Sequence, residues 1–121
     1  LHFARAGHPL PAVVRAGKSM AVSEDGGLPL GLVDSMDYEE VVLQLEPGDR
    51  VALYSDGFIE QPGHSQAGQF GDARFAALLT GATQVLPERL VTDSVDSLTA
   101  WAGKRSFVDD VSLVVVDWLG R

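Results

Sequence analysis

The sequence predicts an α+β fold, and three observations on its 121 residues support that class. In the first 55 residues, short apolar stretches are separated by turn formers, a spacing typical of antiparallel strands joined by tight connections. Further along, apolar residues recur at three- and four-residue steps, as on one face of a helix. A continuous apolar run later in the sequence indicates a buried strand.

Composition limits the size and the partners of the protein. A chain of 121 residues is long enough to bury one hydrophobic core and too short for two, since domains typically have about 100–150 residues. A formal net charge of −8 disfavours phosphate backbones and anionic lipid surfaces, so we expect no nucleic acid and no membrane partner. The absence of cysteine excludes disulfides, thiolate metal sites and cysteine nucleophiles, and it fits a cytoplasmic protein.

The first half is expected to contain short strands separated by turns rich in glycine and proline. In the stretch 38–45, Val41, Leu43 and Leu45 share one face, as the two-residue period of a strand requires. The expected strands are residues 1–6, 12–15, 19–22, 38–45 and 50–55.

The second half is expected to contain two helices. The first spans residues 73–80, with Asp72 as its N-terminal cap and Gly81 just beyond its end. The second starts at Pro87, which suits the first helical position, and ends at Gly103. Its apolar stripe, which would dock on a sheet, consists of Leu90, Val91, Val95, Leu98, Trp101 and Ala102.

Three carboxylates stand at the ends of two apolar strands. Asp56 follows residues 51–54 with only Ser55 between, while Asp109 and Asp110 directly precede residues 111–118, whose successive valines predict a strand covered on both faces. If these strands are antiparallel neighbours, the acids lie at the same edge of a sheet, where their oxygens can converge on a hard cation. An ordinary Asp-Gly turn, and acids that merely mark strand ends, fit the same spacing.

Other catalytic patterns are weaker. None of the histidines belongs to a His-x-x-x-His metal pair, and no serine lies in a Gly-x-Ser-x-Gly elbow. His8 lies in the turn 7–9, where glycine and proline favour a role in backbone shape rather than catalysis.

Several short segments match, in order, the motifs of one protein family. They are residues 4–9 (ARAGHP), 26–32 (GGLPLGL), 45–50 (LEPGDR), 53–60 (LYSDGFIE), 70–71 (FG) and 109–113 (DDVSL). From the first to the last, they span nearly the whole chain. In this order they resemble the C-terminal part of a PPM-type metal-dependent serine/threonine protein phosphatase. The branch is the bacterial one that includes the stage II sporulation phosphatase and the phosphatases that regulate sigma factors.

The resemblance implies a β-sandwich flanked by helices, in αββα layers, with a two-metal centre of Mn²⁺ (manganese) or Mg²⁺ (magnesium) at one edge. In the family, the aspartate of the Ser/Thr-Asp-Gly motif binds metal, and this position corresponds to Asp56. The first aspartate of the Asp-Asp-x-Ser/Thr motif is a second ligand and corresponds to Asp109, whereas Asp110 matches a supporting position and ranks second.

The implied reaction is hydrolysis of phosphoserine or phosphothreonine by a metal-activated water, without a protein nucleophile. The implied substrate is a phosphorylated regulatory protein of the anti-anti-sigma type. Residues 61–69 match a segment near the active site that varies among relatives, and they fit a plain solvated loop equally well.

One part of the family pattern has no counterpart in these residues. The upstream motif, a metal-bridging aspartate followed by glycine, is expected to precede Leu1, which is not a methionine and already lies in an expected strand. Residues 1–121 are therefore expected to be the C-terminal portion of one phosphatase domain and inactive alone. Their exposed strand edges are expected to bind the complementary N-terminal piece or a second copy.

Two other functions remain open. A phosphatase-fold module can bind and regulate a partner without catalysis, and the presence of the upstream aspartate would discriminate between this module and an enzyme. An unrelated small β-rich binding domain would require the ordered motif matches to be accidental.

Overall fold

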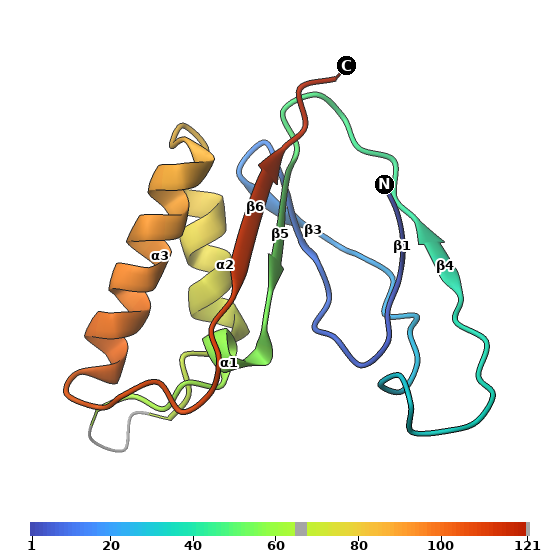
Figure 1. The fold of residues 1–121 in the computed structure, drawn as a ribbon. Helices are drawn as coiled ribbons and strands as arrows, with labels where there is room; N and C mark the ends of the chain where they lie inside the picture. Colours follow the sequence, from blue (N-terminus) through green and yellow to red (C-terminus); the bar gives the residue numbers. More distant parts are fainter. Residues whose placement is uncertain (65–67, 121) are drawn as a thin grey trace.

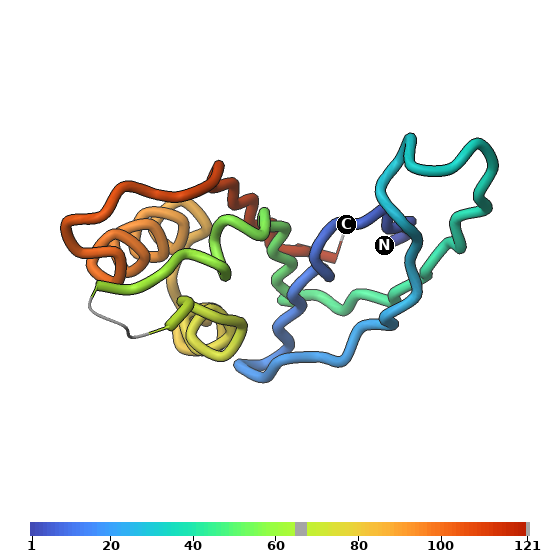
Figure 2. Tube along the Cα trace, turned by 90° about the horizontal axis from the view of Figure 1, so that it is seen from below, coloured from blue at the N-terminus to red at the C-terminus, as the bar shows by residue number. Residues whose placement is uncertain are grey.

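The computed structural model describes residues 1–64 and 68–120, which form three layers (Figure 1). Helices α2 and α3 cover one face of a four-stranded antiparallel sheet with the order β3-β2-β5-β6. The two-stranded sheet β1-β4 lies on the other side (Figure 2). The α+β class is therefore confirmed.

The strands are β1 (His2–Ala4), β2 (Ala12–Arg15), β3 (Lys18–Met20), β4 (Glu40–Val42), β5 (Arg50–Tyr54) and β6 (Leu113–Asp117). The helices are α1 (Asp56–Ile59), α2 (Gly71–Gly81) and α3 (Pro87–Ala102).

Strands β2 and β3 form a tight hairpin, as the sequence predicts. Arg15 pairs with Lys18, so only Ala16 and Gly17 form the turn. Both turn residues have positive φ, 47° and 76°, which matches the right-handed twist of the flanking strands.

The central strand of the larger sheet is β5, which pairs with β2 on one side and with β6 on the other. Its Ala52 is fully buried. The pairing with β6 runs from Arg50 opposite Asp117 to Tyr54 opposite Leu113. The end of β5 and the start of β6 therefore meet at one edge of the sheet.

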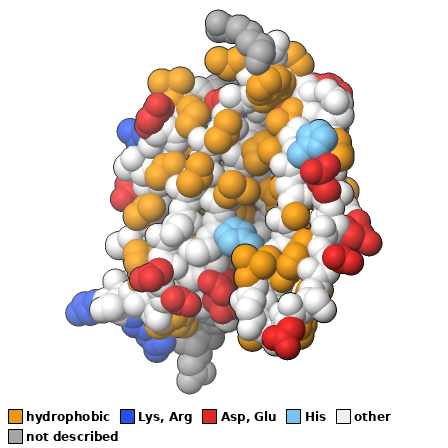
Figure 3. All heavy atoms as spheres, turned by 45° about the vertical axis from the view of Figure 1, so that its right-hand side comes forward, with side chains coloured by type: hydrophobic (Ala, Val, Ile, Leu, Met, Phe, Trp, Pro, Cys, Tyr) orange, Lys and Arg blue, Asp and Glu red, His pale blue; other side chains and the backbone are white. Residues whose placement is uncertain are grey.

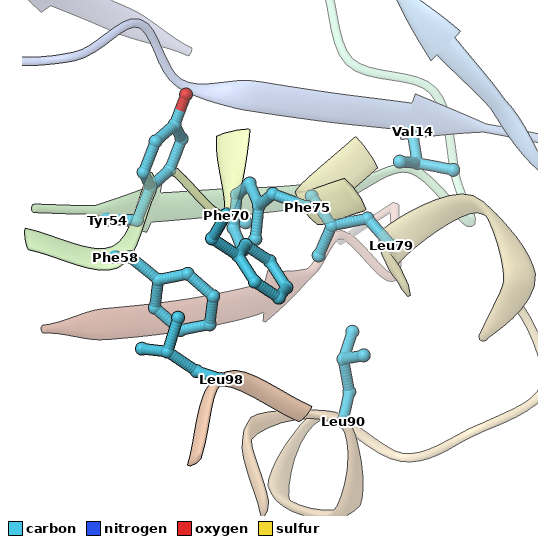
Figure 4. Packing of buried hydrophobic residues seen from close by; sticks show 9 residues of the cluster. Val14, Tyr54, Phe58, Phe70, Phe75, Leu79, Leu90 and Leu98 are labelled. Carbon is cyan, nitrogen blue, oxygen red and sulfur yellow. The ribbon is translucent and has the colours of Figure 1, made fainter. Parts of the chain in front are cut away.

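The core lies between this sheet and the helices, and aromatic rings form its centre (Figure 4). The Phe75 ring lies 4.4 Å from Tyr54 and 5.0 Å from Phe58, centroid to centroid, and Phe70 meets Phe58 edge-on at 5.7 Å. Burying one such side chain stabilises a fold by roughly 1.5–3 kcal/mol. The aliphatic side chains around these rings are Val14, Leu79, Leu90 and Leu98. Together they fix the helices on the sheet.

A buried arginine ties the connection between α2 and α3 to the sheet. Arg50 donates to both carboxylate oxygens of Asp117, at 2.6 and 2.8 Å. It also donates to the carbonyl oxygens of Ala82 (2.8 Å) and Val85 (2.6 Å). The hydrogen bonds to Asp117 raise the pKa of Arg50 above its ordinary value, so the guanidinium stays charged.

A second ion pair closes the turn before β5. Arg15 donates to both oxygens of the buried Asp49, at 2.9 and 2.7 Å, and to Glu46 at 2.6 Å. These hydrogen bonds lower the pKa of Asp49 below its ordinary value.

The elements differ from the sequence-based expectation in several details. The position before the first helical residue of α2 is Phe70, so Asp72 already lies inside the first turn, and its expected role as the cap is wrong. Gly81 is the last residue of α2 rather than the residue after it. The single turn α1 was not expected. Strand β2 has the predicted bounds. The other strands lie near their predicted positions but are shorter, most of all β4, which was expected to span residues 38–45.

One face of β5 and β6 carries apolar side chains that the helices leave open. Leu53, Val114 and Val116 share this face and are 44%, 54% and 52% exposed. The expectation that residues 111–118 are covered on both faces is therefore wrong for the described residues. The helices pack on only one side of β6 (Figure 1).

A cavity of about 720 Å³ lies between this open face and β1, and Figure 3 shows hydrophobic side chains gathered in the hollow between the two sheets. Its apolar lining includes Phe3, Leu45, Leu53, Val116 and Trp118.

None of the helices within residues 1–64 and 68–120 is both long enough and apolar enough to span a membrane.

Candidate metal centre

The β5–β6 pairing brings the candidate acids together. Asp56 starts α1 two residues after the end of β5, and Asp109 and Asp110 lie just before β6. A Cβ at Gly57 would collide with the Asp110 carbonyl oxygen and would lie 3.2 Å from Asp109 Cβ. The two acidic segments therefore lie at the same edge of the sheet, as predicted, and only glycine fits where they touch.

The Ser55 side chain joins the same two segments. Its hydroxyl donates to the Asp110 carbonyl oxygen at 2.9 Å and accepts from the Ser112 N–H at 2.9 Å. The Ser55 N–H donates to the Ser112 carbonyl oxygen at 3.1 Å. The sheet pairing thus continues past β5 up to the acids.

The carboxylates of Asp56 and Asp109 are each oriented by a hydrogen bond from the next residue in the chain. Asp56 Oδ1 accepts from the Gly57 N–H at 2.9 Å, and Asp109 Oδ1 accepts from the Asp110 N–H at 2.7 Å. All three acids are exposed, and none forms an ion pair with an arginine, lysine or histidine of residues 1–64 and 68–120. The second oxygen of Asp56 and of Asp109 is therefore available to a cation.

The donors fit a hard divalent cation in kind. Carboxylate oxygens are the ligands that Mg²⁺ and Mn²⁺ prefer, and such ions use few carboxylates alongside several waters. In the part of the chain that the structure describes, no three acidic, histidine or cysteine side chains form a group able to hold an ion. These residues therefore supply only part of a metal centre, and their role as ligands stays a prediction.

The acids open onto two shallow grooves. Asp109 and Asp110 line one of about 530 Å³, together with Phe107 and Val108. Asp56 lines the other, of about 520 Å³. Polar side chains around this second groove are Arg5, His8, Tyr54, Glu60 and Asp72. Burial raises the pKa of Tyr54, and the negative charge of Asp72 adds to the rise.

Close backbone contacts shape the turn 7–9, which lines the groove beside Asp56. Gly7 has φ of 75° and donates its N–H to the Gly27 carbonyl oxygen at 2.8 Å, while the Gly27 N–H donates to the Arg5 carbonyl oxygen at 2.8 Å. A Cβ at Gly7 would collide with Pro29. The His8 ring lies 3.0 Å from the carbonyl oxygen of its neighbour Pro9. These contacts agree with a role of the turn in backbone shape.

The other two histidines lie away from the acids. His2 contacts Glu40 at 3.0 Å on the two-stranded sheet. His64 contacts the Trp101 carbonyl oxygen at 3.1 Å, at the end of α3.

Sequence reasoning missed the role of the segment after α1. A plain solvated loop was one reading of residues 61–69, but Gln61 and Gly63 are buried. Residues 65–67 lie outside the described residues, and the expectation for that part is not tested.

Comparison with known proteins identifies the family. The model of the family "Stage II sporulation protein E (SpoIIE)" matches residues 1–119. Stage II sporulation protein E of Bacillus subtilis (strain 168) is 26% identical over 107 residues, which are 88% of this chain and 12% of that protein. The chain therefore spans a small part of this relative.

Solved structures agree with the fold. The manganese-presoaked phosphatase domain of SpoIIE from Bacillus subtilis has a TM-score of 0.72 at 21% identity, over 99% of this chain and 51% of that one. The RsbU and RsbW domains of Rv1364c from Mycobacterium tuberculosis give a TM-score of 0.70 at 31% identity, over 94% of this chain and 31% of that one. Because the family model matches nearly the whole chain, this chain belongs to the stage II sporulation protein E (SpoIIE) family.

Proposed function

We propose that this chain supplies part of the active site of a metal-dependent protein phosphatase. Asp56 and Asp109 are the ligands it contributes to a centre of two Mn²⁺ or Mg²⁺ ions, and Asp110 supports them. The observation that supports the proposal is the contact, at the β5–β6 edge, between the two segments that carry these exposed acids, which have no cationic partner among the described residues. The presoaking of the SpoIIE phosphatase domain with manganese supports this choice of metal.

The chain's own residues hold and orient the acids. Bound divalent cations would activate a water molecule and balance the charge of the phosphoryl group. In Asp56 and in Asp109, one carboxylate oxygen accepts a hydrogen bond from a backbone N–H, which leaves the other oxygen for a cation. Ser55 and Gly57 keep the two acidic segments in contact.

The proposed substrate is a phosphoserine or phosphothreonine protein of the anti-anti-sigma type, dephosphorylated in the cytoplasm. This proposal rests on the order of the motifs, which resembles the sigma-factor-regulating branch, and on the similarity to the RsbU and RsbW domains of Rv1364c. The open grooves beside the acids are suited to a segment of a protein substrate, since small-molecule sites are usually enclosed pockets.

Residues 1–121 are proposed to be the C-terminal portion of one phosphatase domain. The chain spans about half of the solved SpoIIE phosphatase domain, and one apolar face of β5 and β6 lies open. The missing ligands, including the metal-bridging aspartate of the family, would come from residues before Leu1. The chain alone is therefore proposed to be inactive.

A noncatalytic phosphatase-fold module that binds and regulates a partner is the second candidate. The observation that favours it is the absence, among residues 1–64 and 68–120, of a complete group of metal ligands. A protein that also lacks the upstream aspartate would belong to this class.

The deciding experiment is manganese-dependent release of phosphate from a phosphoserine protein by the full-length protein and by residues 1–121. Turnover by the full-length protein that disappears on chelation supports the phosphatase. Absence of turnover, with binding of the same phosphoprotein retained, supports the regulatory module.

A further inference from the structure

Gln61 is a fully buried polar side chain that none of the family motifs explains. It follows Glu60 directly, at the end of the segment that begins with Ser55 and Asp56. A buried amide is costly unless it is hydrogen-bonded. Its hydrogen-bond partners therefore indicate which part of the molecule it holds.

The Gln61 side-chain amide forms hydrogen bonds with the segment that precedes Asp109 and Asp110. Its Oε1 accepts from the N–H of Val108, the residue before Asp109, at 3.1 Å. Its Nε2 donates to the carbonyl oxygen of Ser106 at 3.4 Å and to that of Pro62 at 3.2 Å. One side chain thus fixes the backbone on the N-terminal side of Asp109.

The backbone of Gln61 is held in turn by the helical layer. Its carbonyl oxygen accepts from Trp101 Nε1 at 3.1 Å and from the Phe70 N–H at 2.9 Å. The Phe70 ring is buried and packs edge-on against Trp101, with 6.2 Å between ring centroids. The helical layer therefore fixes the position of Gln61 independently of residues 106–112.

Ser55 forms a second set of hydrogen bonds, on the C-terminal side of Asp109. The Ser55 hydroxyl binds the Asp110 carbonyl oxygen and the Ser112 N–H, both at 2.9 Å. Residues 55–61 are thus hydrogen-bonded to residues 106–112 at two places, one on each side of Asp109. Asp56 belongs to the first segment, so both attachments set its separation from Asp109.

We propose that Gln61 is a positioning residue of the metal centre. By fixing Val108, it holds the Asp109 carboxylate within reach of a cation bound at Asp56. Gln61 itself touches neither acid, and it acts through the backbone. This inference rests on the proposed metal role of the two acids.

Gln61→Met tests the inference in the full-length protein, because methionine nearly keeps the volume of glutamine and removes its hydrogen bonds. We expect Mn²⁺ affinity, measured by calorimetric titration, to fall by about 10- to 100-fold, as for other groups that orient metal ligands. Hydrogen exchange at the Val108 amide should accelerate. Phosphate release should recover at saturating Mn²⁺.

Two further variants separate positioning from general stability. Gln61→Glu should bind Mn²⁺ nearly as the wild type, because a buried glutamate favours its protonated form, which offers both an acceptor and a donor. Leu90→Ala removes a buried side chain near the start of α3, at the opposite end of the helix from the acid segment (Figure 1). It should lower the melting temperature and leave Mn²⁺ affinity unchanged.

Wild-type Mn²⁺ affinity and unchanged Val108 exchange in Gln61→Met would overturn the inference. So would an equal loss of affinity in Leu90→Ala. If Gln61→Met does not fold, a large loss of affinity in Gln61→Glu would overturn it as well. A wild-type protein that binds Mn²⁺ in a Gln61-dependent manner but releases no phosphate would refute the proposed function and leave the positioning role intact.

Discussion

Replacement of Gly57 by alanine should disable the metal centre while leaving the fold intact. A Cβ at this position would collide with the Asp110 carbonyl oxygen, and it would lie 3.1 Å from the Asp110 carbonyl carbon and 3.2 Å from Asp109 Cβ. Carbon atoms in contact are ordinarily about 3.5–4.0 Å apart, so the acid segment has to move, and the oxygen has to retreat by about 1 Å. The separation of Asp56 from Asp109 would then increase.

A displacement of this size affects catalysis more than stability. Misplacing a catalytic group by about 1 Å costs about 100-fold in rate, or about 2.7 kcal/mol of barrier. Overpacking destabilises a fold by about 1–3 kcal/mol. Alanine offsets up to about 1 kcal/mol of this, because it favours a helix more than glycine does. For Gly57→Ala we therefore expect a rate about 100-fold lower and only a small decrease in melting temperature.

The assay is phosphate release from a phosphoserine protein by the full-length enzyme over a range of Mn²⁺ concentrations, with thermal unfolding of the same samples. Gly81→Ala is the matched control, because Gly81 ends α2 and the space that its Cβ would enter is open. The rate of phosphate release by Gly81→Ala should equal that of the wild type. An unchanged rate in Gly57→Ala, or an equal loss in Gly81→Ala, would refute the reasoning.

Three more predictions concern the acids, the isolated chain and pH. In the full-length protein, Asp56→Asn and Asp109→Asn should each abolish most phosphatase activity and Asp110→Asn should lower it less, because an amide keeps the shape of a carboxylate and loses its charge; unchanged turnover in the first two would rule out the metal assignment. The 121-residue chain alone should show little catalysis, bind Mn²⁺ weakly, and self-associate or retain the complementary N-terminal piece through its open apolar face and strand edges; sedimentation and mass spectrometry that find a compact 12.9 kDa monomer would contradict this. Because Arg15 lowers the pKa of Asp49 below 3.8, the stabilisation by this pair is present above that pH and disappears as the pH falls through the lowered pKa. In urea unfolding of the full-length protein, Asp49→Asn should therefore reduce the free energy of unfolding by about 1.5–3 kcal/mol at neutral pH and much less in strong acid, and a loss independent of pH would argue against the pair.

The position of the acids could be predicted from the sequence because it depends on one simple geometric rule. Asp56 follows an apolar strand and Asp109 precedes another, and antiparallel neighbours place such ends at the same edge. The local apolar pattern also predicted α3 and the approximate place of every strand, since burial of one face imposes a regular period.

What the sequence did not reveal depends on contacts between distant residues. The Gln61 side chain binds Val108, 47 residues later, and no local pattern signals such a hydrogen bond. The Asp-Gly pair at residues 56–57 looked like a turn, and the single turn of α1 is too short to show a helical period. Valines on both faces of residues 111–118 predicted two covering layers, but within the described residues only one layer of helices covers that strand.

The central claim is that Asp56 and Asp109 bind a common metal centre. Anomalous diffraction at the manganese absorption edge, from crystals of the full phosphatase domain soaked in Mn²⁺, tests it most directly. The claim predicts anomalous peaks in contact with the carboxylates of both Asp56 and Asp109. Manganese bound elsewhere, with both carboxylates free of metal, would contradict it.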